Sequence, residues 1–361
     1  MSKIISIGTA LPAHCHRQAD IQNFMEVVFA LDKQENRKLK FLYHNSGIDY
    51  RYSVIADFTR LVNEWAFFPQ TENLEPFPSL EKRMAWFQKF AAPLSVNAIN
   101  NCLKGKIDAR QITHLITVSC TGLNAPGLDL QVIELLDLSK NIYRSSVNFM
   151  GCYAAIHALK MADAICKNEK QAKVMVVCTE LCTLHFQKQG TADHISSSLL
   201  FGDGSAAVLV VADEDEHAGL RLNSFYSEIL SKGKKDMAWE LSSSGFVMKL
   251  SGYIPELIEE DFSPLVEKAV AEAGISKNEI SKWCIHPGGK RILQAIHKSL
   301  GFKNGELNEC FNVLKNYGNM SSPTILFVLK NLMQQILSGE KIFGAAFGPG
   351  LTMETFVATA T

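Results

Sequence analysis

The apolar residues of this chain fall into two patterns that alternate along most of its length. Short, nearly continuous apolar runs rich in Val and Ile are typical of strands buried on both faces, and longer segments with apolar residues every three or four positions are typical of helices. Strands are predicted in this way at 4–7, within 107–120, at 174–178 and 206–211, within 275–287 and at 342–347. The alternation predicts an α/β fold with covered sheets.

Two segments depart from this regular alternation. Residues 20–45 predict one helix with a charged face. Residues 57–81 are irregular and aromatic, with turn signals at Phe68-Pro69, Glu75-Pro76 and Phe77-Pro78. The aromatic segment fits two descriptions equally: a packed loop, or a surface excursion that lines the mouth of a tunnel.

The order of predicted elements repeats in the second half of the chain. Residues 93–120 give a helix, a capped turn, a buried strand and a Gly-containing loop, and residues 264–289 give the same succession. Gly151-Cys152 and Gly318-Asn319 then each open a predicted helix that leads to a strand, which begins 22 positions after Cys152 and 23 after Asn319. Such a repeat indicates one α/β unit used twice.

A polar stretch at 214–219 follows a predicted strand and marks the division between the repeated units. We expect an N-terminal half at 1–217 and a C-terminal half at 218–361. A duplicated fold can place equivalent loops face to face across a pseudo-two-fold axis. Cys152, His286 and Asn319, each at a strand end or a helix start, are therefore expected to converge on one pocket.

Composition and charge narrow the class of protein. With 361 residues and 47% hydrophobic content, the chain can bury a large core. Its 36 Lys and Arg against 37 Asp and Glu give no bulk electrostatic case for nucleic acid or an anionic membrane surface. The polar N-terminus lacks a signal-peptide core, and no run of 18 apolar residues predicts a membrane span, so a cytoplasmic location is expected. Nine cysteines without CxxC pairs indicate neither a disulfide framework nor a metal site.

Cys152 is the first candidate for chemistry. A predicted helix begins at this residue, and the unpaired N–H groups and partial positive charge of a helix start favour a thiolate. The alternative is that Cys152 is one of several small residues in a buried helix, since free cysteine is among the most buried residue types.

His286 and Asn319 complete a possible site. An imidazole can take the proton of a thiol or pair with the thiolate, and an amide N–H donor suits a developing oxyanion. Each signal is weak when taken alone. A single His is often a satisfied structural residue, and an Asn after Gly is often a turn or a helix cap.

Five motifs together resemble one known family. They are Gly151-Cys152, His286-Pro287-Gly288-Gly289, Tyr317-Gly318-Asn319-Met320-Ser321-Ser322, Phe201-Gly202-Asp203-Gly204 and Phe347-Gly348-Pro349-Gly350-Leu351-Thr352-Met353-Glu354-Thr355. From about Thr113 to the end, the chain resembles the chalcone and stilbene synthases, the type III polyketide synthases, and in its departures a bacterial-type member. The resemblance implies a thiolase-like duplicated fold of two similar α/β halves packed as five layers (αβαβα).

The resemblance also implies an activity. It suggests a homodimeric acyltransferase that loads an acyl group from an acyl-CoA onto Cys152 and extends it with malonyl-CoA, without metal or bound cofactor. His286 and Asn319 match the residues that stabilise the enolate formed by malonyl decarboxylation. Cyclisation would then give a pyrone, resorcinol or phloroglucinol-type product.

Further positions are carried over from the family motifs. Phe201 matches a gatekeeper between the CoA tunnel and the cavity. Without the resemblance, Phe201 could also be an aromatic residue of the core that precedes a turn. The other substrate-binding candidates are the second gatekeeper Met248, the cavity positions His185, Trp239, Cys120 and Ser321, and the CoA-phosphate candidates Lys290 and Arg291. Bulky His185 and Trp239 depart from the plant pattern, which places chalcone itself in doubt. Lys290 and Arg291 also fit a solvated pair at a helix start.

Two other functions compete with this hypothesis. An initiating 3-oxoacyl-[acyl-carrier-protein] synthase shares the fold and the Cys-His-Asn set. A non-catalytic acyl-binding protein that keeps the fold is the alternative from another class, and the intact set of Cys152, His286 and Asn319 argues against it.

Overall fold

The computed structural model describes residues 1–71, 73–230, 232, 237–303 and 305–361. Its strands are β1 (Ser2–Ala10), β2 (His14–Arg17), β3 (Tyr50–Ser53), β4 (His114–Ser119), β5 (Tyr143–Asn148), β6 (Lys173–Leu181), β7 (Asp203–Ala212), β8 (Leu220–Ile229), β9 (Met237–Ser242), β10 (Gly245–Leu250), β11 (Ile280–Ile285), β12 (Lys341–Gly348) and β13 (Thr352–Ala360).

The α-helices are α1 (Gln18–Phe29), α2 (Lys33–Asn45), α3 (Leu80–Leu103), α4 (Leu128–Leu135), α5 (Ala154–Asn168), α6 (Ala192–Leu200), α7 (Ile254–Glu272), α8 (Lys290–Ser299), α9 (Asn308–Tyr317) and α10 (Thr324–Met333). Short 3₁₀ turns include η1 (Asp57–Thr59), η3 (Ala109–Gln111), η4 (Cys182–His185) and η6 (Lys277–Glu279).

The two halves of the chain form sheets with the same pairing pattern. In the first, β1 pairs antiparallel with β7, β7 antiparallel with β6, and β6 parallel with β4, beyond which β5 forms the edge. In the second, β8, β13, β12 and β11 repeat this antiparallel, antiparallel, parallel succession. Ser2–Ile4 of β1 also pairs with Leu220–Leu222 of β8, so the two sheets share a short hydrogen-bonded seam. The predicted duplication is confirmed.

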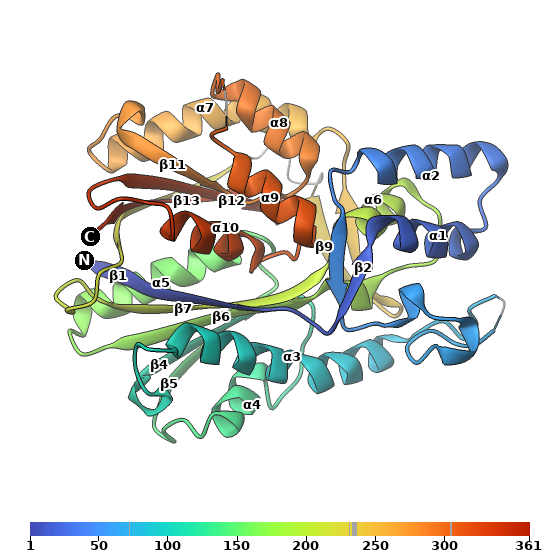
Figure 1. Ribbon diagram of the computed structural model, residues 1–361, viewed down its shortest axis with the longest axis horizontal. Coiled ribbons are helices and arrows are strands. Elements are labelled where there is room, and N and C mark those ends of the chain that lie inside the picture. The colour runs from blue at the N-terminus through green and yellow to red at the C-terminus, as the bar shows by residue number, and fades with distance from the viewer. Residues whose placement is uncertain (72, 231, 233–236, 304) are drawn as a thin grey trace.

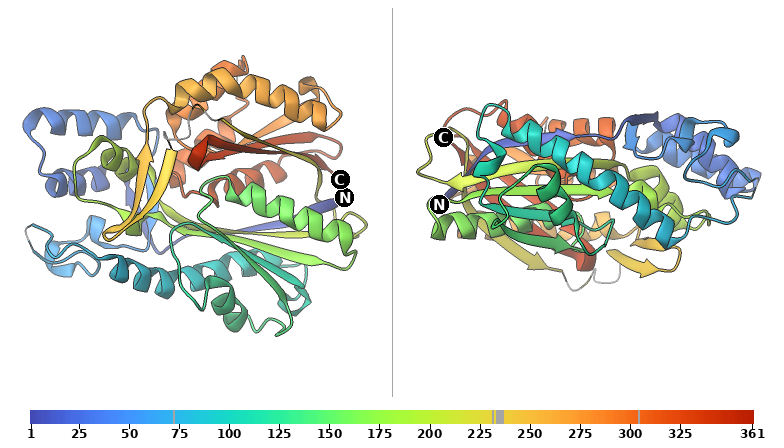
Figure 2. Two further views of the ribbon diagram at one scale, coloured as in Figure 1. Left: turned by 180° about the vertical axis from the view of Figure 1, so that it is seen from behind. Right: turned by 90° about the horizontal axis from the view of Figure 1, so that it is seen from below.

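Helices separate and cover these two sheets. Helices α5 and α10 lie between them and contact strands of both, while α3 and α4 cover the first sheet and α7 covers the second, with α8 packed against α7 (Figure 1). The order is therefore α7/α8, sheet, α5/α10, sheet, α3/α4, which Figure 2 shows from two further directions. This confirms the predicted five-layered, thiolase-like architecture.

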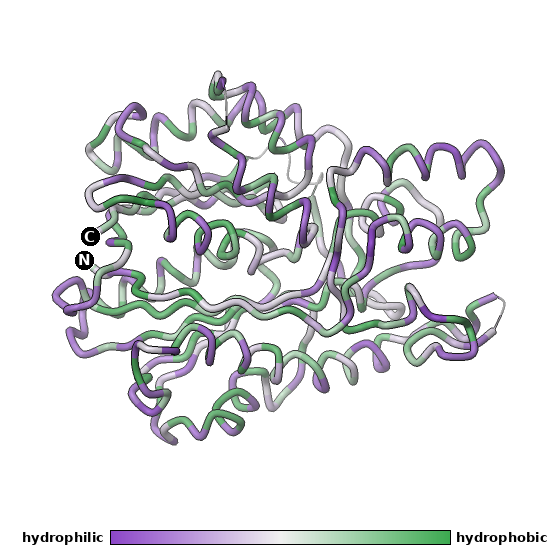
Figure 3. Tube along the Cα trace, in the orientation of Figure 1, coloured by the Kyte–Doolittle hydropathy of each residue, from purple (hydrophilic) through white to green (hydrophobic). Residues whose placement is uncertain are grey.

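The most hydrophobic strands lie in the middle of these layers. Every residue of β7 is buried, as is nearly all of β6 and β12, because a strand covered by helices on both faces exposes neither. Figure 3 shows the same distribution, with hydrophobic residues along the sheets and inner helices and hydrophilic residues on α2 and on the outer face of α7. None of the described helices has the length and apolar content needed to cross a bilayer.

One end of the molecule carries elements that lie outside the repeat. Helices α1, α2 and α6, the paired strands β2 and β3, and the hairpin of β9 and β10 gather there (Figure 1). The prediction of one helix over 20–45 is wrong: Ala30 adopts a left-handed backbone with φ of 46°, and the Asp32 carboxylate accepts hydrogen bonds from Gln34 N and Glu35 N at 2.8 Å to start α2.

The aromatic segment 57–81 is a packed loop. The buried Asp57 carboxylate accepts hydrogen bonds from the backbone N–H groups of Ala66, Phe67 and Phe68 at 3.1, 2.9 and 2.8 Å. Phe67 and Phe68 are buried with their ring centroids 5.0 Å apart. Of the two descriptions that the sequence allowed, these contacts support the loop, although Phe58 also lines a cavity of about 600 Å³.

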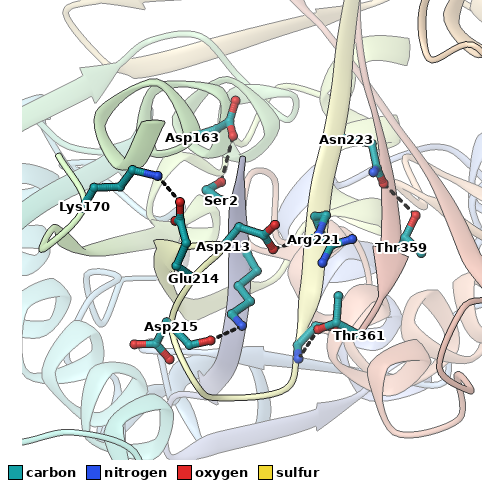
Figure 4. Close-up of polar contacts among 12 residues, drawn as sticks. Ser2, Asp163, Lys170, Asp213, Glu214, Asp215, Arg221, Asn223, Thr359 and Thr361 are labelled. Carbon is teal, nitrogen blue, oxygen red and sulfur yellow. Dashed lines mark hydrogen bonds and ion pairs between the residues drawn. The ribbon is translucent and has the colours of Figure 1, made fainter. Parts of the chain in front are cut away.

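Polar contacts hold the connection between the halves against both chain termini (Figure 4). The Arg221 Nε donates to Asp213 Oδ1 at 2.8 Å, Lys170 pairs with Glu214, and Gly219 N donates to Thr361 Oγ1 at 3.1 Å. The connection begins at the C-terminal end of β7, whereas the Phe201 loop precedes its N-terminal end. The length of β7 separates the two by about 30 Å at an ordinary strand rise. The exact division at residue 217 stays a prediction.

Candidate active site

Cys152 lies in the turn between β5 and α5. Phe149 and Gly151 have left-handed φ values of 59° and 80°, and a Cβ on Gly151 would lie 2.3 Å from Pro349 Cδ. Glycine is therefore required for this close turn. The predicted helix start is wrong by two residues, because α5 begins at Ala154 and Cys152 precedes it.

The Cys152 thiol is protonated in this environment. Burial raises its pKa to about 11; the charge of Glu180 adds to this, while hydrogen bonds with Ser321 and Asn319 oppose it. The Cys152 Sγ donates to Ser321 Oγ at 3.6 Å. The raised pKa contradicts the expectation that the helix start favours a thiolate, so a proton acceptor is needed to activate the thiol.

Asn319 is fixed between the Phe201 loop and the His286 loop. Its backbone N–H donates to Leu200 O and its carbonyl accepts from Gly202 N, both at 2.9 Å. Its Nδ2 donates to Gly288 O at 3.3 Å, and its Oδ1 accepts from Ser321 N at 2.7 Å. Asn319 precedes α10 by five residues, so like Cys152 it stands before a helix and not within it.

His286 follows β11 directly and is held by its backbone N–H, which donates to Ala345 O at 2.8 Å. The residue is 1% exposed, and neither ring nitrogen has a hydrogen-bond partner among the described residues. Burial lowers its pKa to about 3, so the imidazole is neutral. A buried polar group without a partner costs about 1–3 kcal/mol, and this one is free to bind a ligand.

Glu180 is a buried carboxylate that the sequence analysis missed. It stands near the end of β6, and its Oε2 accepts hydrogen bonds from Cys120 N at 2.9 Å and Thr121 Oγ1 at 2.7 Å. Its Oε1 accepts from Ser322 Oγ at 2.8 Å. The only sequence signal was a charged residue two positions after the apolar run 174–178. Glu180 fixes the Cys120 and Ser322 segments around the thiol.

A cavity of about 390 Å³, here called the thiol chamber, joins several predicted residues. Its walls are Cys120, Thr121, Gly151, Cys152, Cys182, Phe201, Met237, Trp239, Met248, Ser321 and Pro349. The chamber therefore brings Cys120, Phe201, Trp239, Met248 and Ser321 to Cys152. Asn319 is in hydrogen-bonding contact with Cys152, whereas His286 is linked to the site through its loop, by the bond from Asn319 to Gly288.

An aromatic wall bounds the thiol chamber. The His185 Nε2 donates to Thr121 O at 2.8 Å, its Nδ1 accepts from Phe246 N at 3.0 Å, and the ring stacks on Phe246 at 4.3 Å. The Trp239 Nε1 donates to Cys120 O at 2.7 Å, and its ring lies edge-on to His185 at 5.6 Å. Burial lowers the pKa of His185 to about 3. His185 is thus a satisfied, neutral wall residue and lines the neighbouring cavity, not the chamber itself.

The two basic candidates differ in their surroundings. The Lys290 Nζ donates to Asn45 O at 3.4 Å, and a Cβ on Gly47 would lie 3.1 Å from Lys290 Cδ, so this lysine lies against the segment after α2. Arg291 forms an exposed ion pair with Glu256 at 2.9 Å. Lys290 is therefore the better placed of the two to meet an anionic group near the site.

Comparison with known proteins gives matches over the whole chain. Residues 1–214 match the N-terminal domain and residues 221–361 the C-terminal domain of chalcone and stilbene synthases. The alpha-pyrone synthesis polyketide synthase-like Pks18 of Mycobacterium tuberculosis is 30% identical over 359 residues, covering 97% of this chain and 89% of that protein. Probable polyketide synthase 1 of Dictyostelium discoideum is 29% identical over 98% of this chain, which spans 11% of that protein.

Solved structures give the same result. The C-terminal type III polyketide synthase domain of Steely1, a type I/III hybrid from Dictyostelium, superposes with a TM-score of 0.92 at 28% identity, covering 99% of each chain. PKS-I from the brown alga Ectocarpus siliculosus superposes with a TM-score of 0.93 at 23% identity over 100% of this chain and 98% of that one, which supports the fold. The chain therefore belongs to the chalcone and stilbene synthase family, the type III polyketide synthases.

Proposed function

We propose that this polyketide synthase carries its starter on Cys152. The Cys152 sulfur attacks the carbonyl of an acyl-CoA, the thioester bond to CoA breaks, and CoA leaves as the thiol. Burial keeps the His286 imidazole neutral, so a ring nitrogen is available to accept the thiol proton, and pairing of the resulting imidazolium with the thiolate offsets the gap between their pKa values.

The extension step uses malonyl-CoA. Loss of CO₂ from its malonyl group leaves an enolate whose oxygen is held by the His286 N–H and the Asn319 Nδ2, and the enolate carbon attacks the acyl carbonyl on Cys152. A carbon–carbon bond forms, and the Cys152 sulfur leaves as a thiolate that is reprotonated. The reaction as proposed needs no metal or bound cofactor.

One observation carries this assignment. His286 is buried and neutral with two unpartnered ring nitrogens, and the Asn319 amide reaches both its loop and the Cys152 thiol. Nucleophile and oxyanion donors of this kind, buried beside a largely apolar cavity, suit acyl transfer and enolate stabilisation. They are also the residues that match the family motifs.

Product and cellular location follow as further proposals. Of the pyrone, resorcinol and phloroglucinol types, a pyrone is favoured by the name of the Mycobacterium tuberculosis relative. Because both substrates are CoA thioesters, we place the reaction in the cytoplasm.

A homodimer is supported by the free edge of the first sheet. Strand β5 is the outer strand and its residues are largely exposed, with Tyr143 68% exposed. Leu123 and Leu135 are exposed large apolar residues of the same half. An uncovered edge strand is a site of association, and a second copy would cover it. Light scattering should give twice the mass of one chain; a monomer at micromolar concentration contradicts this proposal.

The function is tested by incubating the protein with malonyl-CoA and a panel of acyl-CoAs, without carrier protein, and following products by mass spectrometry. Cys152→Ala should abolish condensation while decarboxylation of malonyl-CoA continues, and Asn319→Ala should impair both. Cys15→Ala is the matched control because Cys15 is exposed. Product formed only after malonylated carrier protein is added would favour the initiating 3-oxoacyl synthase instead, and no catalysis with either would favour an acyl-binding protein.

A further inference from the structure

Two buried polar residues, Gln18 and Arg51, join the start of α1 to the short strand β3. The Arg51 Nε donates to Gln18 Oε1 at 2.8 Å, and the Gln18 backbone N–H donates to Asp49 O at 2.8 Å. Both residues lie within the first 60 positions of the chain, outside the five motifs. The reaction described above assigns no role to this pair, which we call the Gln18–Arg51 clamp.

The clamp holds the Phe201 loop by its backbone. The Gln18 Nε2 donates to Leu199 O at 2.7 Å, and the Arg51 Nη1 donates to Phe201 O at 2.7 Å. The Gln18 amide therefore uses its oxygen for Arg51 and its nitrogen for the loop. Two carbonyl groups of the loop are fixed by side chains from the first 60 residues.

Asn319 shares the Phe201 loop with the clamp. Its backbone N–H donates to Leu200 O and its carbonyl accepts from Gly202 N, both at 2.9 Å, which makes a parallel β-bridge between Phe201 and Asn319. The Leu200 carbonyl lies between the two carbonyls that the clamp holds. A shift of the loop therefore moves the backbone of Asn319, whose Nδ2 takes part in the proposed reaction.

Arg51 also lies against the residue that precedes Asn319. A Cβ on Gly318 would lie 2.9 Å from Arg51 Cγ and 2.8 Å from Leu200 O, so the backbone runs close to the aliphatic stem of the arginine. The φ of Gly318 is 67°, a value that favours glycine. One arginine side chain thus meets both segments of the site, the Phe201 loop through Nη1 and the Asn319 segment through its stem.

The charge of Arg51 is costly at this position. The residue is 3% exposed, and burial is the main cause that lowers its pKa. A buried charged group often contributes less to stability than a well-packed apolar side chain of similar volume. Stability therefore gives little reason for an arginine here, whereas a rigid planar group that joins the Gln18 amide to Phe201 O does.

We propose that Gln18 and Arg51 are positioning residues for the extension step. They act through the backbone of Phe201 and Asn319 to hold the Asn319 Nδ2 where the enolate oxygen forms. The inference rests on the proposed function, because it assumes that Asn319 stabilises the enolate. A displacement of about 1 Å in such a group can cost about 100-fold in rate, so loss of the clamp should slow decarboxylation about tenfold or more.

The test follows malonyl-CoA alone in the Cys152→Ala background, where the enolate takes up a proton and leaves as acetyl-CoA. Arg51→Met keeps the aliphatic stem and removes the donors, and Gln18→Leu breaks the clamp from its other side. Each should lower kcat about tenfold or more and change KM less than about threefold, as expected when an interaction made only in the transition state is lost. Arg221→Met is the control with unchanged kcat, since Arg221 pairs with Asp213 beyond the other end of β7.

A double variant separates positioning from folding. Adding Arg51→Met to Asn319→Ala should lower kcat less than about twofold further, because the group that the clamp positions is already absent. A clamp that only stabilises the fold would add its own loss, so multiplied losses would overturn the inference. Urea unfolding identifies a variant that does not fold, and Gln18→Leu replaces Arg51→Met in the double variant if the latter fails.

The remaining outcomes separate the inference from the proposed function. Folded Arg51→Met and Gln18→Leu variants that decarboxylate malonyl-CoA at the parent rate would overturn the inference while the proposed function stands. If Asn319→Ala itself decarboxylates at the parent rate, the proposed role of Asn319 is wrong and the inference falls with it. Acyl loading on Cys152, followed by intact-protein mass spectrometry in variants that keep this thiol, should change less than about threefold, because loading precedes the enolate. Loading that falls as much as decarboxylation would show a structural role only.

Discussion

Glu180 is the residue at which a change of charge with little change of shape should alter both stability and thiol reactivity. Its Oε2 accepts from Cys120 N, Thr121 Oγ1 and Ser119 Oγ at 2.9, 2.7 and 3.2 Å, and its Oε1 from Ser322 Oγ at 2.8 Å. In Glu180→Gln the amide oxygen is expected at the Oε2 position, because the backbone N–H of Cys120 cannot turn away. The Ser322 hydroxyl can rotate and accept from the new NH₂ group.

The stability change follows from these bonds. A hydrogen bond to a charged group is worth about 1.5–3 kcal/mol and one between neutral groups about 0.5–1.5 kcal/mol. Burial nevertheless raises the pKa of Glu180 by more than its hydrogen bonds lower it, so the buried charge costs stability on balance. We therefore expect Glu180→Gln, which removes the charge, to keep or raise the free energy of unfolding at pH 7. Glu180→Ala leaves the Cys120 N–H and the Thr121 hydroxyl without their acceptor and should lower it by about 1–3 kcal/mol for each group. Urea unfolding measures both.

The thiol effect has a definite sign. After burial, the charge of Glu180 is a further cause that raises the pKa of Cys152. Removing that charge should lower the pKa, and one pKa unit corresponds to tenfold in the thiolate fraction at pH 8. Alkylation of Cys152 by iodoacetamide, followed by mass spectrometry, should become about 2–10 times faster. Glu228→Gln is the control, since Glu228 of β8 pairs with Lys268 of α7 and not with the residues around Cys152. Alkylation of a folded Glu180→Gln variant at or below the wild-type rate would refute the reasoning.

Three other predictions follow from the same contacts. His286 has a pKa of about 3, below its unfolded value of 6.5, so the unfolded state binds more protons between these two pH values. The free energy of unfolding should therefore fall as the pH drops from about 6.5 toward 3, by up to about 1.4 kcal/mol per pH unit. Urea unfolding at pH 6.5 and pH 5 should show a smaller fall for His286→Gln than for wild type, and an equal fall would contradict this. Trp239→Gly removes the indole and its bond to Cys120 O, so products with a further malonyl unit should appear in mass spectra, whereas an unchanged product length would show that the wall does not limit extension. Asp57→Ala leaves the N–H groups of the aromatic loop without their acceptor and should lower the free energy of unfolding by about 2–4 kcal/mol. Asp49→Ala, which removes only an exposed carboxylate paired with Lys315, is the control with an effect near zero.

The local sequence pattern was sufficient to predict a helix or strand wherever burial alone decides which residues the segment contains. The apolar runs of β6, β7 and β12 were predicted because a strand covered on both faces has to be apolar throughout. The helix over 20–45 was predicted as one because its charged face continues through Ala30, and the break there depends on a backbone conformation that composition does not reveal. The start of α5 was predicted two residues too early, at Cys152. The positive φ values of Phe149 and Gly151 extend the turn before this helix, and composition does not reveal them either.

The sequence by itself determined the duplicated α/β architecture, the family, and Cys152, His286 and Asn319 as candidates, because each depends on periodicity or on a motif that is contiguous in the chain. Only the tertiary structure decided which of these side chains meet and in what charge state. The pKa of Cys152 is raised and that of His286 lowered because burial penalises the charged form of either group, and burial depends on neighbours that are distant in sequence. The contacts of Glu180, the aromatic wall of His185 and Trp239, and the cavity of about 600 Å³ beside α1 arise in the same way, because they join segments that no local pattern connects.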